Sequence, residues 1–123
     1  MGDINPPLSI EGIPQAAKSI ALILNDPDAV EGSFDHWVAW NIPPSTCKIG
    51  EHTALGTEGL NSADEHGYHG PCPPPGKPHR YFFKVYALDR QLALGENSHK
   101  KDVEKAMQGH ILAKGELIGL FRR

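Results

Sequence analysis

Prolines and glycines divide this chain into short segments, and this punctuation constrains its fold more than any other feature. The sequence holds eleven prolines and thirteen glycines among its 123 residues. Most of them fall between short apolar runs, a pattern typical of domains whose many strands are joined by turns. We therefore expect an all-β domain.

Three apolar runs are the strongest strand candidates, at residues 19–25, 35–42 and 79–87. The first two are each followed by proline, which cannot donate a hydrogen bond to a central strand ladder. The first two runs are expected to be antiparallel neighbours. The one clear helix is expected at residues 98–108, where Ser98 can cap its start and Gly109 can end it. Residues 111–121 contain β-branched residues and two glycines, which favour a closing strand over a helix.

Length and charge narrow the function classes. A chain of 123 residues with 39% hydrophobic content suits a single domain over residues 1–123. The net charge of −3 and the scattered basic residues argue against a nucleic-acid partner. No run is long enough to span a bilayer, and no export signal is visible, so we expect a cytoplasmic protein, or a periplasmic or secreted one if a signal segment has been removed. Length and charge do not decide whether the chain forms a homodimer.

Polar side chains that could bind a ligand lie at the ends of the expected strands. Parity places Asp26 and His36 on mainly apolar faces of their strands. Pairing of these strands would bring the two side chains together, while His79 and Tyr81 share a face where the third strand begins. The apolar companions are Ile20, Leu22 and Leu24 for Asp26, and Val38, Trp40 and Ile42 for His36. We expect these four groups to converge at one end of the fold.

Such a set suits a small anionic or phosphorylated ligand. Imidazole N–H groups donate to phosphate or sulfate oxygens, and backbone N–H groups at Gly70 can line the opening. Asp26 can orient a histidine or accept from an ammonium group. The histidines lack zinc-type spacing, so we expect no metal and no cofactor. No serine lies in a nucleophile-elbow pattern, so a hydrolase is the less favoured interpretation and a non-enzymatic role is expected.

Several ordered segments resemble the bacterial and archaeal branch of the phosphatidylethanolamine-binding protein family. They run through nearly the whole chain: Asp26-Pro27-Asp28-Ala29, Phe34-Asp35-His36-Trp37-Val38, Trp40-Asn41-Ile42-Pro43, Gly67-Tyr68-His69-Gly70-Pro71-Cys72-Pro73-Pro74, His79-Arg80-Tyr81, and Gly109-His110-Ile111-Leu112-Ala113-Lys114. The resemblance implies an antiparallel, Greek-key-like β-sandwich with one or two peripheral helices. It also implies binding of phosphate-like anions or phosphorylated head groups without a metal.

The resemblance also assigns roles to individual residues. It implies a ligand-binding set with Gly70 at its rim: Asp26, His36, Gly70, Pro74, His79 and Tyr81. Asp28 and Arg80 are expected to act as scaffold. An alternative role, inhibition of a serine protease or a kinase, would use residues 45–69 and the proline-rich loop. The family usually has an additional N-terminal strand and a proline where this chain has Val30, so a missing strand and a looser rim are also expected.

Overall fold

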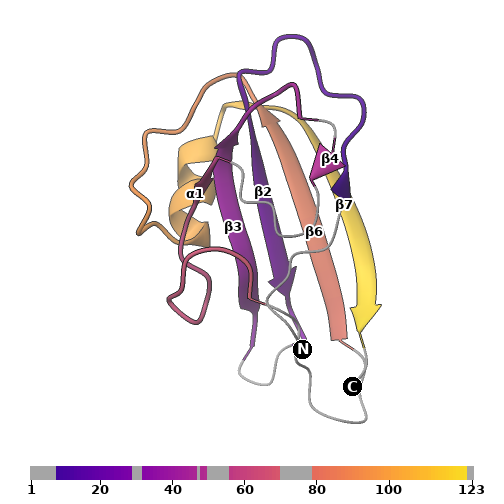
Figure 1. Cartoon of the computed structure of the whole chain (residues 1–123), viewed down its shortest axis with the longest axis vertical. Helices are drawn as coiled ribbons and strands as arrows, with labels where there is room; N and C mark the ends of the chain where they lie inside the picture. The colour runs from indigo at the N-terminus through magenta and orange to yellow at the C-terminus, as the bar shows by residue number, and fades with distance from the viewer. Residues whose placement is uncertain (1–7, 29–31, 47, 50–55, 70–78, 122–123) are drawn as a thin grey trace.

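The computed structural model describes residues 8–28, 32–46, 48–49, 56–69 and 79–121, and its elements follow the proline-bounded runs closely (Figure 1). The strands and the helix are β1 (Leu8–Ser9), β2 (Ser19–Asp26), β3 (Phe34–Ile42), β4 (Lys48–Ile49), β5 (Thr57–Glu58), β6 (His79–Leu88), α1 (Lys100–Met107) and β7 (Ile111–Phe121). The three expected strands, the single helix and the closing strand are therefore confirmed.

The strands form two antiparallel sheets. Five of them lie in the order β5-β3-β2-β6-β7, and β1 pairs with β4 in a separate two-stranded ribbon. The first two long strands, β2 and β3, are antiparallel neighbours as expected. The mainly antiparallel β fold with a peripheral helix is thus observed, while the complete Greek-key sandwich stays a prediction. Among the described residues, no helix is both long and apolar enough to cross a membrane.

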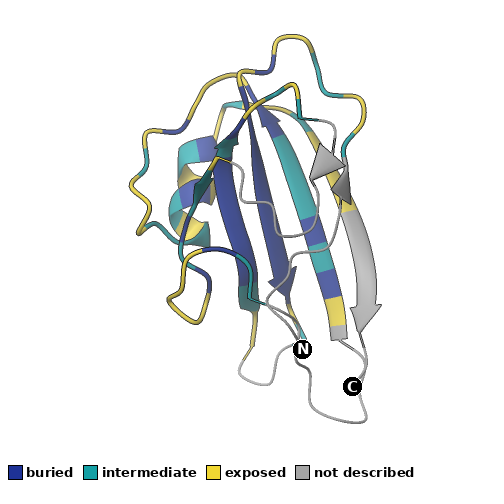
Figure 2. Cartoon of the chain, in the orientation of Figure 1, coloured by how far each residue is buried: buried dark blue, intermediate teal, exposed yellow. Residues whose placement is uncertain are grey.

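The central strands of the large sheet are buried on both faces and are the most deeply buried of the described residues, whereas residues 111–116 of the edge strand β7 are largely exposed (Figure 2). One face, which we call the ribbon face, carries Ile20, Leu22 and Leu24, with Ile10 and Ile13 from the segment after β1 packed against them. The opposite face, the helix face, packs against α1 and the loop before it. Its core residues are Ala21, Ile23, Val38, Trp40, Leu88, Leu92, Val103 and Met107. A strand apolar on both faces belongs at the centre of a sheet, which is where β2 lies.

The helix begins one residue later than expected. His99, not Ser98, occupies the N-cap, and its backbone N–H donates to the Asp102 carboxylate at 2.9 Å. The carboxylate three residues into a helix can satisfy the cap's own N–H, and this fixes the start at His99. The helix ends where expected, since Gly109 has a φ of 79° that favours glycine.

The pairing of β3 with β2 contains two irregularities, and each adds one residue to β3. Leu24 pairs with Trp37 but the next residue, Asn25, pairs with Asp35, so His36 has no partner on β2. A bulge of this kind turns the extra side chain out of the regular alternation. The predicted parity of His36 with Val38 and Trp40 is therefore wrong: those two residues lie on the helix face, whereas His36 contacts residues of the ribbon face.

Candidate functional site

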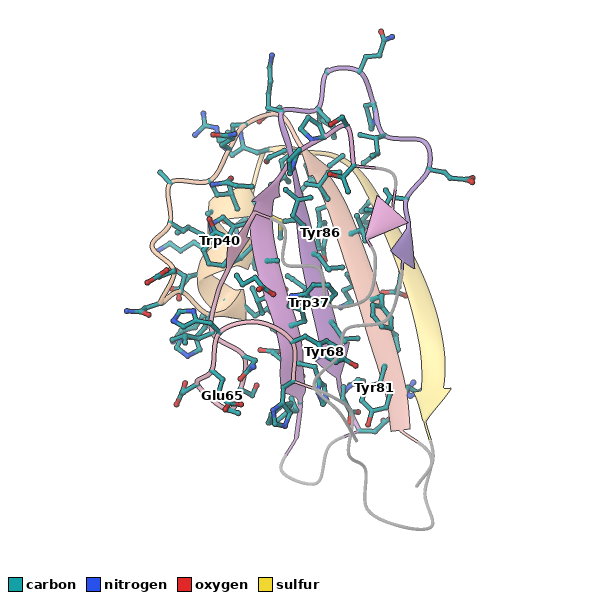
Figure 3. The ribbon with its side chains drawn as sticks, in the orientation of Figure 1. Trp37, Trp40, Glu65, Tyr68, Tyr81 and Tyr86 are labelled. Atoms are coloured by element: carbon teal, nitrogen blue, oxygen red, sulfur yellow. The ribbon has the colours of Figure 1, made fainter. Side chains whose placement is uncertain are left out.

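Three of the six expected site residues, Asp26, His36 and Tyr81, have described side chains, and all three are buried at one end of the ribbon face. Their exposed fractions are 2% for Asp26, 5% for His36 and 2% for Tyr81. The rings of His36 and Tyr81 lie 5.2 Å apart in an edge-on arrangement. Figure 3 shows Tyr81 at the lower end of β6, near Trp37 and Tyr68. Gly70, Pro74 and the side chain of His79 lie outside the described residues.

The bulge in β3 is what brings His36 to this site. Trp37 packs with Leu24 on the ribbon face, and the unpaired His36 is turned toward the same face, where its ring meets those of Phe34 and Tyr81. Without the extra residue, strict alternation would send His36 and Trp37 to opposite faces. The site therefore depends on an insertion in the strand as much as on the identity of the residue.

His36 is oriented by a backbone hydrogen bond. Its Nδ1 lies 2.7 Å from the carbonyl oxygen of His69, and the N–H of His69 donates to the carbonyl of His36 at 2.8 Å. A carbonyl can only accept, so Nδ1 carries the proton and the neutral ring presents Nε2 as an acceptor. This bond fixes both the tautomer and the direction of the ring.

Burial sets the charge of this imidazole. Desolvation lowers the pKa of His36 below its usual value, while the bond to His69 and the nearby Asp26 carboxylate act to raise it. Burial prevails, so His36 is neutral at pH 7. Nearby Asp26 accepts a hydrogen bond from the backbone N–H of Asp28 at 2.8 Å, which holds that carboxylate where β2 ends.

Two further aromatic rings surround His36, and sequence reasoning did not include them. The ring centre of His69 lies 6.0 Å from that of His36 and 5.5 Å from that of Phe34, and the His69 side chain remains 35% exposed. Its Nδ1 lies 3.3 Å from the Glu65 carboxylate. The signal that could have found His69 is its position directly before Gly70 in the segment that carries the family resemblance.

A loop held by its own hydrogen bonds brings His69 to the site. Asn61 is 1% exposed, and its side-chain oxygen accepts from the backbone N–H groups of Ala63 and Glu65 at 2.9 and 3.2 Å. Its amide donates to the carbonyl of Gly67 at 3.1 Å. These three bonds close the loop and return the chain alongside β3.

Asp28 and Arg80 form the expected scaffold pair outside the buried site. Nε and Nη2 of Arg80 each lie 2.9 Å from a different oxygen of the Asp28 carboxylate, and the Arg80 backbone N–H donates to it at 3.0 Å. The Asp28 carboxylate raises the pKa of Arg80. Arg80 is exposed and Asp28 is half-buried, and the bidentate geometry of the pair ties the end of β2 to the start of β6.

The described residues contain no cluster of three or more His, Cys, Asp or Glu side chains that could hold a metal ion. The site is built instead from one carboxylate, one neutral imidazole with a fixed tautomer, one phenol and a border of aromatic rings. Such groups can donate to and accept from a small polar ligand.

Comparison with known proteins places the chain in a family. The sequence profile described as phosphatidylethanolamine-binding protein matches residues 1–122. A UPF0098 protein of Pyrococcus horikoshii is 49% identical over 131 residues, which cover 98% of this chain and 66% of that protein. A UPF0098 protein of Methanothermobacter thermautotrophicus is 47% identical, with 98% of this chain and 84% of that protein covered.

Solved structures agree with these relatives. A phosphatidylethanolamine-binding protein homologue from Chlamydia trachomatis superposes with a TM-score of 0.93 at 40% identity, covering 98% of this chain and 82% of that one. E. coli YbcL, described as a member of the mammalian family, gives a TM-score of 0.88 at 30% identity, covering 98% and 81%. The chain therefore belongs to the phosphatidylethanolamine-binding protein family.

Proposed function

We propose that this protein binds small phosphate-like anions or phosphorylated head groups, without catalysis, at the site formed by Asp26, His36 and Tyr81. The observation that carries the proposal is the buried His36 ring, whose Nδ1–H donates to the His69 carbonyl. Nε2 is therefore the ring nitrogen that would contact the ligand. We propose His79, Gly70 and Pro74 as further parts of this site.

The charge state of His36 specifies how an anion would be held. Nε2 of a neutral ring accepts a hydrogen bond from a protonated phosphate oxygen, and Nε2–H of a protonated ring donates one to an unprotonated oxygen. In both cases the complex contains one proton between nitrogen and oxygen. Charge-assisted hydrogen bonds in a buried site are the stronger class, which favours an ionised ligand over a neutral alcohol.

Asp26 supplies the selectivity for the cationic part of a head group. An ammonium group attached near the phosphate would be attracted by this carboxylate, whose charge already opposes the larger effect by which burial lowers the pKa of His36. A zwitterion such as phosphorylethanolamine would then satisfy Asp26 and His36 at once. Inorganic phosphate would satisfy His36 alone.

Isothermal titration calorimetry with inorganic phosphate and phosphorylethanolamine tests the proposal. Loss of a hydrogen bond to a charged group costs about 1.5–3 kcal/mol, so His36→Gln should weaken binding by about tenfold or more. The matched control is His110→Gln, because His110 pairs with Asp89 at the far end of the sheet. Absence of a His36 ring shift by NMR at millimolar phosphate would refute the proposal.

The alternative, inhibition of a serine protease or a kinase, rests on the family resemblance alone. It predicts a loss of enzyme activity when the protein is added to a panel of such enzymes. Anion binding does not require that result, so the two functions are tested separately.

A further inference from the structure

A cavity of about 440 Å³ lies on the ribbon face at the end opposite to His36. The segment after β1, which supplies one side of the cavity, lies toward the upper end of the sheet in Figure 1, whereas Figure 3 labels Tyr81 at the lower end. Phe83, which lines the cavity, lies two positions from Tyr81 along β6, and Ala87, which also lines it, lies six positions away. At roughly 3.3 Å per residue these separations are about 7 and 20 Å, so the cavity begins near the proposed anion site but shares no lining residue with Asp26, His36 or Tyr81.

Small residues in register create the hollow. Ala87 pairs with Ala113, and Val85 pairs with Gly115, on adjacent strands β6 and β7. All four line the cavity. A Cβ atom added at Gly115 would meet no atom within 4 Å, and the φ of this residue lies outside the left-handed region. The cavity therefore exists because the sheet has small residues at positions where a larger side chain would fit.

The walls are fixed by contacts outside the cavity. Ile10, Ile13 and Pro14 form the wall opposite the sheet, and β1 anchors their N-terminal side by pairing with β4. On the other side the carbonyl of Pro14 accepts from the N–H of Ala17 at 3.0 Å, and the N–H of Lys18 donates to the carbonyl of Leu88 at 2.8 Å. The wall is thus held in place from both ends, as a preformed binding site requires.

The residues that line the cavity indicate what kind of molecule it could bind. Ile20 and Phe83 complete an apolar floor, while the charged residues that line the cavity, Glu11, Lys114 and Glu116, are exposed to solvent. An anion would find no buried donor side chain on this floor. A dry apolar cavity of about 150 Å³ holds one benzene, so a cavity of this size suits a molecule of about two fused or linked rings.

We propose that this cavity binds a small, uncharged, mainly apolar molecule of about bicyclic size, independently of the anion site. Its volume falls within the range of roughly 300–1,000 Å³ that is typical of small-molecule sites. Filling it would bury apolar surface on Ile13 and Val85, which line the cavity and are only partly buried. The protein would then carry two sites of opposite polarity at the two ends of one sheet face.

The test uses N-phenyl-1-naphthylamine, an uncharged two-part aromatic probe with fluorescence that reports apolar binding. We expect saturable binding to the whole protein, with methyl NMR shifts at Ile13, Ile20 and Val85. Gly115→Leu should fill the cavity and weaken binding by about tenfold or more. Ala113→Leu provides a second filling variant in case the first fails to fold. Phosphate should not displace the probe.

The matched control is Gly95→Leu, because Gly95 also has no atom within 4 Å of an added Cβ but lies in an exposed loop. It should bind the probe as the original protein does. Non-saturable binding, or unchanged affinity in both filling variants, would overturn the proposal. A dimer that both filling variants split would overturn it as well, because the cavity would then be covered by a second copy of the chain.

Discussion

The proton on His36 should control the affinity for an anion that carries no proton of its own, and sulfate is such an anion near neutral pH. The neutral ring presents a lone pair at Nε2, because Nδ1–H is bonded to the His69 carbonyl. A sulfate oxygen also presents lone pairs, so the two repel until Nε2 is protonated. Sulfate should therefore bind only together with one proton.

The size of this effect follows from that single proton. While free His36 is neutral, the dissociation constant for sulfate should fall about tenfold for each pH unit of acidification, or about 1.36 kcal/mol. Burial lowers the pKa of His36 below its usual value of about 6.5. The steep region should consequently extend to lower pH than it would for a histidine with the usual pKa.

Calorimetry at two pH values and in two buffers of different ionisation enthalpy measures both the affinity and the proton uptake. His36→Gln should abolish the uptake, and His69→Gln separates a contribution from the neighbouring ring. Asp26 and Asp35 also act on the His36 pKa, so the interval is chosen above the usual range of carboxylates. Sulfate binding without proton uptake, or with the same pH slope in His36→Gln, would refute the reasoning.

The same protonation should lower the stability of the ligand-free protein in acid. The folded state holds the pKa of His36 below its value in the unfolded chain, so the folded state binds fewer protons. This contribution to stability is complete above about pH 6.5 and is lost as the pH falls from there toward the folded-state pKa. Urea unfolding should show a shallower acid loss in His36→Gln, and sulfate should restore the stability of the original protein. Equal pH slopes in the two proteins would contradict the assignment.

Two substitutions away from the site test how the sheet is packed. Gly59→Ala would place a Cβ 2.6 Å from the carbonyl oxygen of Ser98. This clash should lower the free energy of unfolding, measured in urea, by about 1–3 kcal/mol. The control Gly95→Ala has open space around the added Cβ and should leave the stability unchanged. Asn41 has a φ of 55° and its side chain bonds both the N–H and the carbonyl of Leu92, at 2.7 and 2.9 Å. Asn41→Ala should lower the free energy of unfolding by about 2–4 kcal/mol, and Asn41→Asp should lower it by less. Equal stability of the two variants would argue against the role of the amide.

Local chemistry was enough to predict the strands. Proline cannot join a central ladder, so Pro27 and the pair Pro43–Pro44 limit β2 and β3 to within one residue of the runs seen in the sequence. Gly109 likewise ends α1 because its backbone adopts a left-handed conformation. These signals act within a few residues, and they can be read without knowledge of the tertiary structure.

Long-range contacts decided what the sequence could not predict. The loop that carries His69 is shaped by Asn61, whose hydrogen bonds reach Ala63, Glu65 and Gly67. The polar composition of residues 45–69 resembles that of any surface connection, so the return of His69 to β3 is visible only in the folded chain.

The register of β3 has the largest consequence for function. Alternation predicted that Asp26 and His36 would lie close together, and the Asp26 carboxylate is near enough to act on the pKa of His36. Of the companions predicted for His36, Val38 and Trp40 lie on the opposite face and only Ile42 lies on the ribbon face. The unpaired position between Trp37 and Asp35 allows His36 to leave the helix face, where Val38 lies, while Asp35 remains in an ion pair with Lys100 of α1. A bulge costs ladder hydrogen bonds, and here it places a polar ring on an otherwise apolar face. The anion site that we propose at this end of the ribbon face would therefore arise from an added residue in β3, whereas the cavity toward the other end lies where β7 carries the small residues Ala113 and Gly115.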